Sequence, residues 1–236
     1  MGRAFEYRRA AKEKRWDKMS KLFPKLGRTI TLAAKAGGPD PESNAALRTA
    51  VLNAKAENMP KDNITKAIER ASGKDEADFA EVSYEGKGPH GVLFWVDAAT
   101  DKVTRTVANV RTLFTKSGGE LVSNGSLEFL FSRKTVVEFD KADGLNLEEL
   151  ELALMDAGLE EFDAETERVY VYGDYKDFGA LTRCCEDLGI ENMKASLQRI
   201  PTSPVEITEE QMTEVEDLID KLEDDEDVQA VYTNLA

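Results

Sequence analysis

The sequence predicts a multidomain α+β protein, in which an N-terminal all-α three-helix bundle is followed by two ferredoxin-like α+β domains, one inserted in the other. Three observations predict this class. Apolar residues recur at helical spacing through residues 24–74. Two successive blocks of mixed strand and helix patterns follow. A last helix and strand, placed after a proline-containing linker, supply the elements that the first block lacks.

The bundle is predicted from three short helices that follow a basic segment. Gly37-Gly38-Pro39 ends the first helix, as glycine followed by proline commonly does. Pro60 begins the third helix, where the missing N–H costs nothing. The faces expected to be buried are Leu22, Leu26, Ile30 and Ala33; Leu47, Val51 and Ala54; and Ile64, Ala67, Ile68 and Ala71.

The first mixed block contains two strands, a helix and a hairpin. The strands are expected at Glu81–Tyr84 and Gly91–Val96. The helix is predicted by the spacing of Val103, Val107, Val110 and Phe114. The hairpin joins apolar runs around Leu121 and at Leu127–Phe131 through Ser123-Asn124-Gly125-Ser126, because Asn-Gly between such runs favours a tight turn.

The second block repeats these patterns. Its strands are expected at Val136–Phe139, Val169–Tyr172 and Met193–Ile200, and its helix faces are Leu147, Leu150 and Leu154, then Phe178, Leu181, Cys185 and Leu188. After Pro201 and Pro204 come a helix with Met212, Val215, Ile219 and Leu222 and a strand at Val228–Tyr232. We therefore expect a basic arm (1–23), a helical bundle (24–76), a middle α+β domain (77–132 plus 203–236) and an inserted α+β domain (133–202).

Composition excludes several classes of protein. Hydrophobic residues are 41% and charged residues 33%, which is typical of a globular chain. No apolar run approaches the ~20 residues that span a membrane, and the N-terminus lacks a signal-peptide core, so we expect a cytoplasmic protein. Cys184 and Cys185 are adjacent and cannot form a disulfide scaffold. His90 is the single histidine, which excludes sites with two, and no metal or other cofactor is expected.

Charge is distributed very unevenly along the chain. The net charge is −15, but residues 1–74 hold 17 basic and 8 acidic residues, a net of +9. Residues 75–236 carry the remaining 14 basic and 38 acidic residues, a net of −24. Such asymmetry indicates a polyanion-binding segment, which the overall acidic composition hides.

The basic arm is the candidate nucleic-acid interface. Arginine gives bidentate contacts to phosphate, and aromatic rings such as Trp16 stack on bases. The other interpretation is a solubilising tail. The candidate residues are Arg3, Arg8, Arg9, Lys12, Lys14, Arg15, Trp16, Lys18, Lys21, Lys25 and Arg28, with Arg105, Arg111 and Lys116 as an extension on the middle helix.

Four other motifs have structural interpretations. Gly86, Gly88 and Gly91 match G-x-G-x-x-G, but a strand follows them instead of a helix, so we interpret them as a loop between strands. His90 lacks a nucleophile nearby in sequence and is interpreted as an exposed loop residue. The cysteines are interpreted as small core residues. The run 224–227 lacks the spacing of a calcium loop and is interpreted as a solvated acidic connection.

Several segments together resemble the YebC/PmpR family of probable transcriptional regulators, which includes mitochondrial translational activators of cytochrome oxidase subunit synthesis. They cover nearly the full length: Ala33 to Pro41, Asn58 to Ile64, Tyr84 to Val92, Arg105 to Arg111, Lys116 to Gly119 with Gly125-Ser126, and Leu222 to Tyr232. Many members begin with Gly-His-Ser-Lys-Trp, whereas this chain begins Gly2-Arg3-Ala4-Phe5-Glu6. The resemblance implies three domains, no catalytic activity, a cytoplasmic location and nucleic-acid binding.

The sequence therefore supports two functions. The first is a non-enzymatic transcriptional regulator that contacts DNA phosphates through the arm and the bundle, while its acidic remainder stays free for a protein partner. The alternative is a translational activator that binds ribosomal RNA on the ribosome with the same residues. An enzyme is disfavoured, because no nucleophile–base pair or metal cluster is found by spacing.

Overall fold

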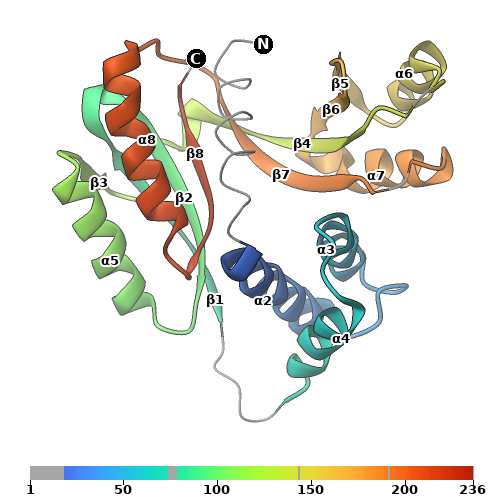
Figure 1. Ribbon diagram of the computed structural model, residues 1–236, viewed down its shortest axis with the longest axis horizontal. Coiled ribbons are helices and arrows are strands. Elements are labelled where there is room, and N and C mark those ends of the chain that lie inside the picture. Colours follow the sequence, from blue (N-terminus) through green and yellow to red (C-terminus); the bar gives the residue numbers. More distant parts are fainter. Residues whose placement is uncertain (1–18, 74–78, 143, 191, 236) are drawn as a thin grey trace. The chain divides into compact units, whose positions relative to one another are not determined.

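A computed structural model describes residues 19–73, 79–142, 144–190 and 192–235 (Figure 1). The contacts within the chain define two compact units. The first unit contains the described residues of 1–28, 75–132 and 199–236, and the second contains those of 29–74 and 133–198. Each unit holds one four-stranded sheet with helices packed on it. The predicted α+β fold class, with helices first and sheet domains after them, is confirmed.

The first unit is built on the sheet β3-β1-β2-β8, which is antiparallel throughout. The last strand of the chain pairs with β2, so that Trp95 lies opposite Tyr232. The elements in chain order are β1 (Ala80–Lys87), a short 3-10 turn η1 (Pro89–Gly91), β2 (Leu93–Thr100), α5 (Val103–Lys116), β3 (Glu120–Val122), α8 (Glu209–Glu223) and β8 (Val228–Thr233).

The core of the first unit lies between the sheet and the helices α5 and α8. Phe94 on β2 meets Phe114 on α5 edge to face, with ring centroids 5.4 Å apart. Leu218 and Leu222 on α8 are fully buried in the same cluster. A capping box starts α8, because the Thr208 side chain accepts from the Gln211 N–H and the Gln211 side chain accepts from the Thr208 N–H. The predicted face of α8 is confirmed. On α5, Val110 and Phe114 are buried and Val107 is partly buried, but Val103 is 42% exposed, so the prediction is wrong at that residue.

The predicted hairpin at residues 121–131 is wrong. β3 pairs with β1 instead of with the following segment. Residues 128–130 form a 3-10 turn, η2 (Glu128–Leu130), and the strand that begins at Phe131 belongs to the other sheet.

A buried carboxylate explains this difference. Glu85 on β1 is 2% exposed and accepts the backbone N–H groups of Gly125 at 2.5 Å and Leu127 at 2.6 Å. The side-chain amide of Asn124 donates to the carbonyl of Ser83 at 3.1 Å. The Asn-Gly turn is therefore bonded to β1, and the chain after it leaves the sheet.

The second sheet has the order β5-β6-β4-β7 and follows the ferredoxin-like succession strand, helix, strand, strand, helix, strand. The first sheet differs, because two strands precede its first helix. Strand β5 was not predicted from the sequence; its acidic residues obscure the apolar alternation. The elements are β4 (Phe131–Asp140), α6 (Leu147–Met155), β5 (Leu159–Ala164), β6 (Arg168–Asp174), η3 (Tyr175–Asp177), α7 (Phe178–Asp187) and β7 (Lys194–Pro201).

Three helices precede the sheets: α2 (Met19–Gly37), α3 (Ala45–Ala56) and α4 (Lys61–Arg70). Asn44 organises the turn between α2 and α3, since its side chain accepts from Leu47 N–H and donates to the carbonyls of Ala33 and Gly38. α2 contributes residues to both units, since the boundary between them falls after Arg28.

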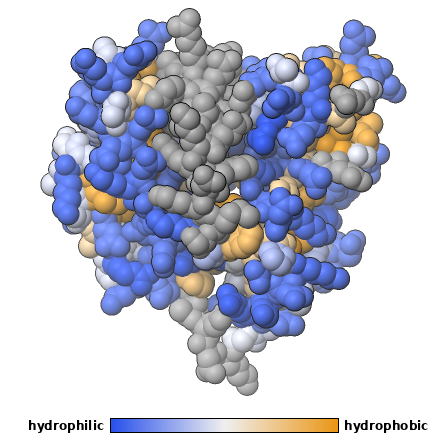
Figure 2. Space-filling model, in the orientation of Figure 1, coloured by the Kyte–Doolittle hydropathy of each residue, from blue (hydrophilic) through white to orange (hydrophobic). Residues whose placement is uncertain are grey.

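Hydrophilic residues cover most of the face drawn in Figure 2.

Candidate nucleic-acid interface

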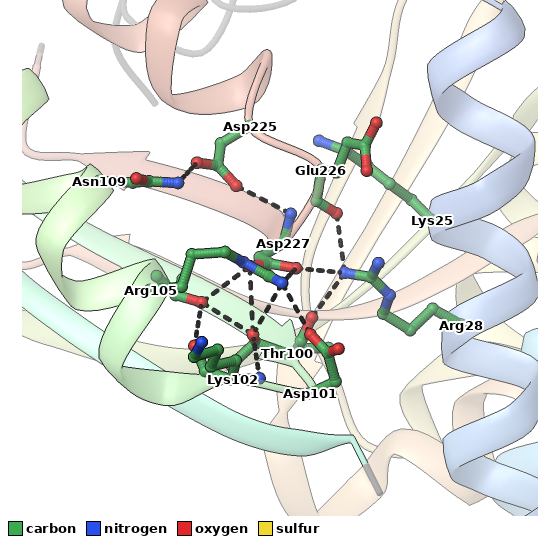
Figure 3. A network of polar contacts seen from close by, with 12 residues as sticks. Lys25, Arg28, Thr100, Asp101, Lys102, Arg105, Asn109, Asp225, Glu226 and Asp227 are labelled. Atoms are coloured by element: carbon green, nitrogen blue, oxygen red, sulfur yellow. Dashed lines mark hydrogen bonds and ion pairs between the residues drawn. The ribbon is translucent and has the colours of Figure 1, made fainter. Parts of the chain in front are cut away.

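Most of the predicted interface precedes the described part of the chain. The predicted residues outside it are Arg3, Arg8, Arg9, Lys12, Lys14, Arg15, Trp16 and Lys18. Three others, Lys21, Lys25 and Arg28, lie on α2 at spacings of four and three, so they share one helical face. That face meets the acidic turn, which we define as residues 224–227 between α8 and β8 (Figure 3).

Arg28 connects α2 to the first sheet. Its Nη1 donates to the carbonyls of Ala99 at 2.6 Å and Glu226 at 2.9 Å, and lies 3.1 Å from Asp227 Oδ1. The guanidinium also lies over the Phe79 ring, 4.7 Å from its centroid. Only 15% of the Arg28 side chain is exposed. Its charge is thus engaged inside the first unit.

Asp227 is the centre of this network. Its side chain is 4% exposed, and Arg105 on α5 binds both carboxylate oxygens through Nη2, at 3.0 Å and 2.8 Å. The hydroxyls of Thr100 and Thr106 donate to Oδ2 at 3.1 Å and 2.8 Å. Burial alone would raise the pKa of Asp227, but the hydrogen bonds from Arg105, Thr106 and Thr100 outweigh it and hold the pKa below its ordinary value.

Asp225 links the acidic turn to its own backbone and to α5. Its Oδ1 accepts the N–H of Asp227 at 2.9 Å, and its Oδ2 accepts from the Asn109 amide on α5 at 3.1 Å. Asp224 and Glu226 are exposed, as expected for a solvated connection, but Asp227 is buried and corrects that interpretation. Within the described ranges, no group of three metal-ligating side chains is found.

Lys21 and Lys25 lie against the end of α8. Lys21 Nζ is 2.9 Å from Asp224 Oδ1, and both side chains are nearly half exposed. Lys25 Nζ donates to the carbonyl of Glu223 at 2.7 Å, in the last turn of α8, where the helix dipole favours a cation. Partial burial lowers the pKa of Lys25, although the carboxylates of Glu223 and its neighbours oppose this.

The three cationic residues predicted on α5 have different surroundings. Arg105 belongs to the Asp227 network and also pairs with Asp101 at 2.7 Å. Arg111 and Lys116 are exposed. Arg111 borders a hollow beside β1 and β3, together with Ser123 and Asn124. Among the predicted residues that the structure describes, Arg111 and Lys116 therefore present their charges outward.

The glycine-rich loop has a packing role. A Cβ on Gly86 would come within 2.5 Å of the Phe114 ring, and one on Gly88 within 2.3 Å of the Phe94 ring. His90 lies in the 3-10 turn between β1 and β2, and its Nε2 is 2.9 Å from Glu214 Oε2 on α8. The loop thus joins two strands, as the sequence predicts.

The cysteines lie on α7 in the second unit. Cys185 is buried in the core, and this burial raises the pKa of its thiol to about 12. The pKa of Cys184 is raised as well, by partial burial and by Asp187 and Asp156. A thiol that stays protonated at neutral pH is a poor nucleophile, which agrees with a core role.

The hydrogen bonds from Thr100 and Thr106 to Asp227 are not predicted from the sequence. The position of Asp227 could have indicated its burial, because it comes directly before Val228, the first buried apolar residue of β8. Thr106 lies on the buried face of α5, one turn before Val110. Polar residues at such positions need partners, but the sequence does not say which.

Comparisons with known proteins cover nearly the whole chain. The model of the TACO1/YebC protein N-terminal domain matches residues 3–74, and that of the TACO1/YebC second and third domain matches residues 79–235. No described helix combines the length and apolar character needed to cross a bilayer.

Individual relatives agree with these matches. The chain is 65% identical over 237 residues to the probable transcriptional regulatory protein WS1016 of Wolinella succinogenes, and 59% identical over 236 residues to a probable transcriptional regulatory protein of Sulfurimonas denitrificans; both alignments cover each chain fully. The crystal structure of the conserved hypothetical protein Aq1575 from Aquifex aeolicus is similar, with 38% identity and a TM-score of 0.83. That match covers 94% of this chain and 93% of the other.

Proposed function

We propose, because this chain belongs to the TACO1/YebC family, that it is a transcriptional regulator and not an enzyme, and that it binds DNA through its basic N-terminal segment. The names of its relatives, probable transcriptional regulatory proteins, support the regulatory role. The observation that carries the DNA contact is the charge distribution. Residues 1–28 hold ten Lys/Arg and three Asp/Glu, in a chain whose net charge is −15.

The free energy of this binding comes mainly from phosphate neutralisation and the release of counterions. Arginines such as Arg8 and Arg9 pair with phosphates in a bidentate manner, and Trp16 stacks on a base. Arg28 holds residues 19–28 of α2, which belong to the first unit, against the sheet of that unit, because its charge is engaged by Asp227. On α5, Arg111 and Lys116 extend the positive surface. The acidic remainder is repelled by DNA, so the protein binds with its N-terminal segment toward the phosphates.

The test of this proposal removes four charges from the arm. In the full chain, Arg8, Arg9, Lys12 and Arg15 are changed together to Ala, and binding to a labelled DNA duplex is followed by fluorescence anisotropy between about 50 and 200 mM salt. The slope of log K against log salt is expected to become less steep by about 3 to 4, since each lost phosphate contact removes roughly 0.9.

A matched control removes four charges elsewhere. Arg133, Lys141, Lys176 and Arg183 belong to the second unit and are changed to Ala in the same way. This variant has the same net charge as the arm variant, and its salt slope is expected to stay close to that of the unchanged chain. Equal slopes for the two variants would refute the arm as the contact surface.

The second candidate function is a translational activator that binds ribosomal RNA on the ribosome. It is favoured by the resemblance described above, since the family it points to includes mitochondrial translational activators, and by the same chemistry, because an arginine-rich segment contacts either backbone. Sedimentation of cell extracts separates the two. Comigration with ribosomes that survives DNase, with no preference for promoter DNA, would replace DNA by the ribosome as the target.

A further inference from the structure

The acidic turn and the end of α8 contact two of the lysines predicted to bind nucleic acid, Lys21 and Lys25. We infer that the first residue of the acidic turn, Asp224, together with the C-terminal carbonyl of α8, competes with nucleic acid for Lys21 and Lys25, so that the unbound protein holds these lysines in an autoinhibitory contact. This inference rests on the proposed function and concerns the regulation of the same basic surface. All the groups involved belong to the first unit.

The contacts that would be exchanged are visible in the structure. Lys21 Nζ lies 2.9 Å from Asp224 Oδ1, and Lys25 Nζ donates to the Glu223 carbonyl at 2.7 Å. A carboxylate offers a lysine ammonium the same kind of anionic oxygen that a phosphate offers. Two anions beside one ammonium repel each other, so phosphate binding at Lys21 weakens its pairing with Asp224.

The acidic turn is held in place by its other end. Asp227 is buried and bound by Arg28 and Arg105, and Asp225 is fixed by Asn109 and by the Asp227 N–H (Figure 3). These bonds keep the start of the turn opposite α2 without any contribution from Asp224. The competitor is therefore presented at a fixed position, at high effective concentration.

The exposure of the two ion pairs, Lys21–Asp224 and Arg28–Asp227, determines which of them a phosphate can displace. The Lys21 and Asp224 side chains are 41% and 45% exposed, and ion pairs of this kind are weak and screened by salt. Arg28 and Asp227 are 15% and 4% exposed, and separating them would leave a buried charge without its partner. A polyanion is thus expected to displace Asp224 while the Arg28–Asp227 pair stays closed.

The acidic turn also explains how a chain of net charge −15 limits its own binding. Glu223, Asp224 and Asp225 all lie near Lys25, and their charges act on its pKa. A phosphate that approaches these lysines meets that negative field first. Removal of the Asp224 charge is therefore expected to strengthen binding more than removal of another exposed carboxylate, although both change the net charge by one.

The experiment compares two substitutions on the same part of the full chain. Asp224→Asn removes the carboxylate that pairs with Lys21, and Asp217→Asn removes a carboxylate on α8 that pairs with Lys221, on α8 as well. Both change the net charge by one, and Asp217 is also exposed. Binding to the labelled duplex is measured by anisotropy. Asp224→Asn is expected to bind about 1.5- to 5-fold more tightly than Asp217→Asn, the range typical of an exposed ion pair.

A double-mutant cycle locates the effect. In a Lys21→Ala background, the difference between Asp224→Asn and Asp217→Asn is expected to become smaller, because the lysine that pairs with Asp224 is gone and only the longer-range effect of Asp224 on Lys25 remains. Asp224→Ser, which also lacks the carboxylate, is expected to behave as Asp224→Asn does, and circular dichroism checks that each variant is folded.

Two failures are distinguishable. Equal affinities of Asp224→Asn and Asp217→Asn, or a difference that is just as large without Lys21, would overturn the competition while leaving nucleic-acid binding intact. Absence of salt-dependent binding by the unchanged chain to both DNA and ribosomal RNA would instead overturn the proposed function itself.

Discussion

Replacing Asp227 with asparagine is expected to destabilise the first unit by about 2–4 kcal/mol. The substitution keeps the size of the side chain but removes its charge. Asp227 accepts bonds from Arg28, Arg105, Thr100 and Thr106, and all four approach as donors. An asparagine NH2 group would meet one of these donors, and the amide oxygen would be left to accept from the others.

The magnitude follows from the burial of the carboxylate. Removing one partner of a fully buried ion pair typically costs about 3–5 kcal/mol, because the other charge stays buried and unpaired. Arg105 is exposed and can be solvated by water after the change, while Arg28 is mostly enclosed. The expected loss of unfolding free energy is therefore about 2–4 kcal/mol, somewhat below the range for a fully buried pair.

Urea unfolding of the full chain, followed by fluorescence, measures this loss. Trp95 lies in the first sheet, and a Trp16→Phe background makes Trp95 the single reporter. The asparagine variant is expected to show a lower midpoint with an unchanged slope. A loss below about 0.5 kcal/mol would refute the view that the Asp227 charge holds α2, α5 and the acidic turn together, since neutral surface changes stay within that range.

The pH dependence gives a second check on the same residue. The pKa of Asp227 is lower in the folded chain than its ordinary value. The stabilisation from its charge is therefore complete above the ordinary carboxyl pKa and is lost as the pH falls through the folded pKa. The stability difference between the unchanged chain and Asp227→Asn should narrow in acid, and a constant difference would contradict the role of the charge.

Two further predictions concern other buried groups. Glu85→Ala should lower the free energy of unfolding in urea by about 2–3 kcal/mol, because the N–H groups of Gly125 and Leu127 lose their acceptor. Glu85→Gln should lower it less, because one acceptor oxygen remains. Equal stability of Glu85→Ala and the unchanged chain would rule this out. Burial raises the pKa of Cys185 to about 12, so its thiol should resist alkylation at pH 8 in the folded chain and react after unfolding in urea. Mass spectrometry of the modified peptide measures both reactions. Rapid labelling of the folded chain would mean that Cys185 is not enclosed.

The sequence contained enough information for most elements of the fold. Helices such as α5 and α8 follow from apolar residues at spacings of three and four, because one continuous face packs on the sheet. The hairpin after Leu121 was wrongly predicted, because the Asn-Gly turn that typically joins two strands here bonds to buried Glu85. A local pattern does not show that a distant carboxylate satisfies the turn.

The candidate site was less predictable than the fold. The charge distribution along the sequence identifies the basic segment, but it treats every lysine and arginine in that segment alike. The structure separates them: Arg28 is enclosed against Asp227, whereas Lys21 pairs with Asp224 at the surface. These pairings join residues about 200 positions apart, so no spacing rule reveals them.

The most direct measurement of the central claim is a map of the residues that touch bound nucleic acid. A duplex with photoreactive bases is bound to the full chain, crosslinked by light, and the crosslinked peptides are identified by mass spectrometry. Crosslinks are expected to concentrate in peptides from residues 3–25. Crosslinks confined to residues 133–198, with the N-terminal peptides unmodified, would refute nucleic-acid binding by the basic segment.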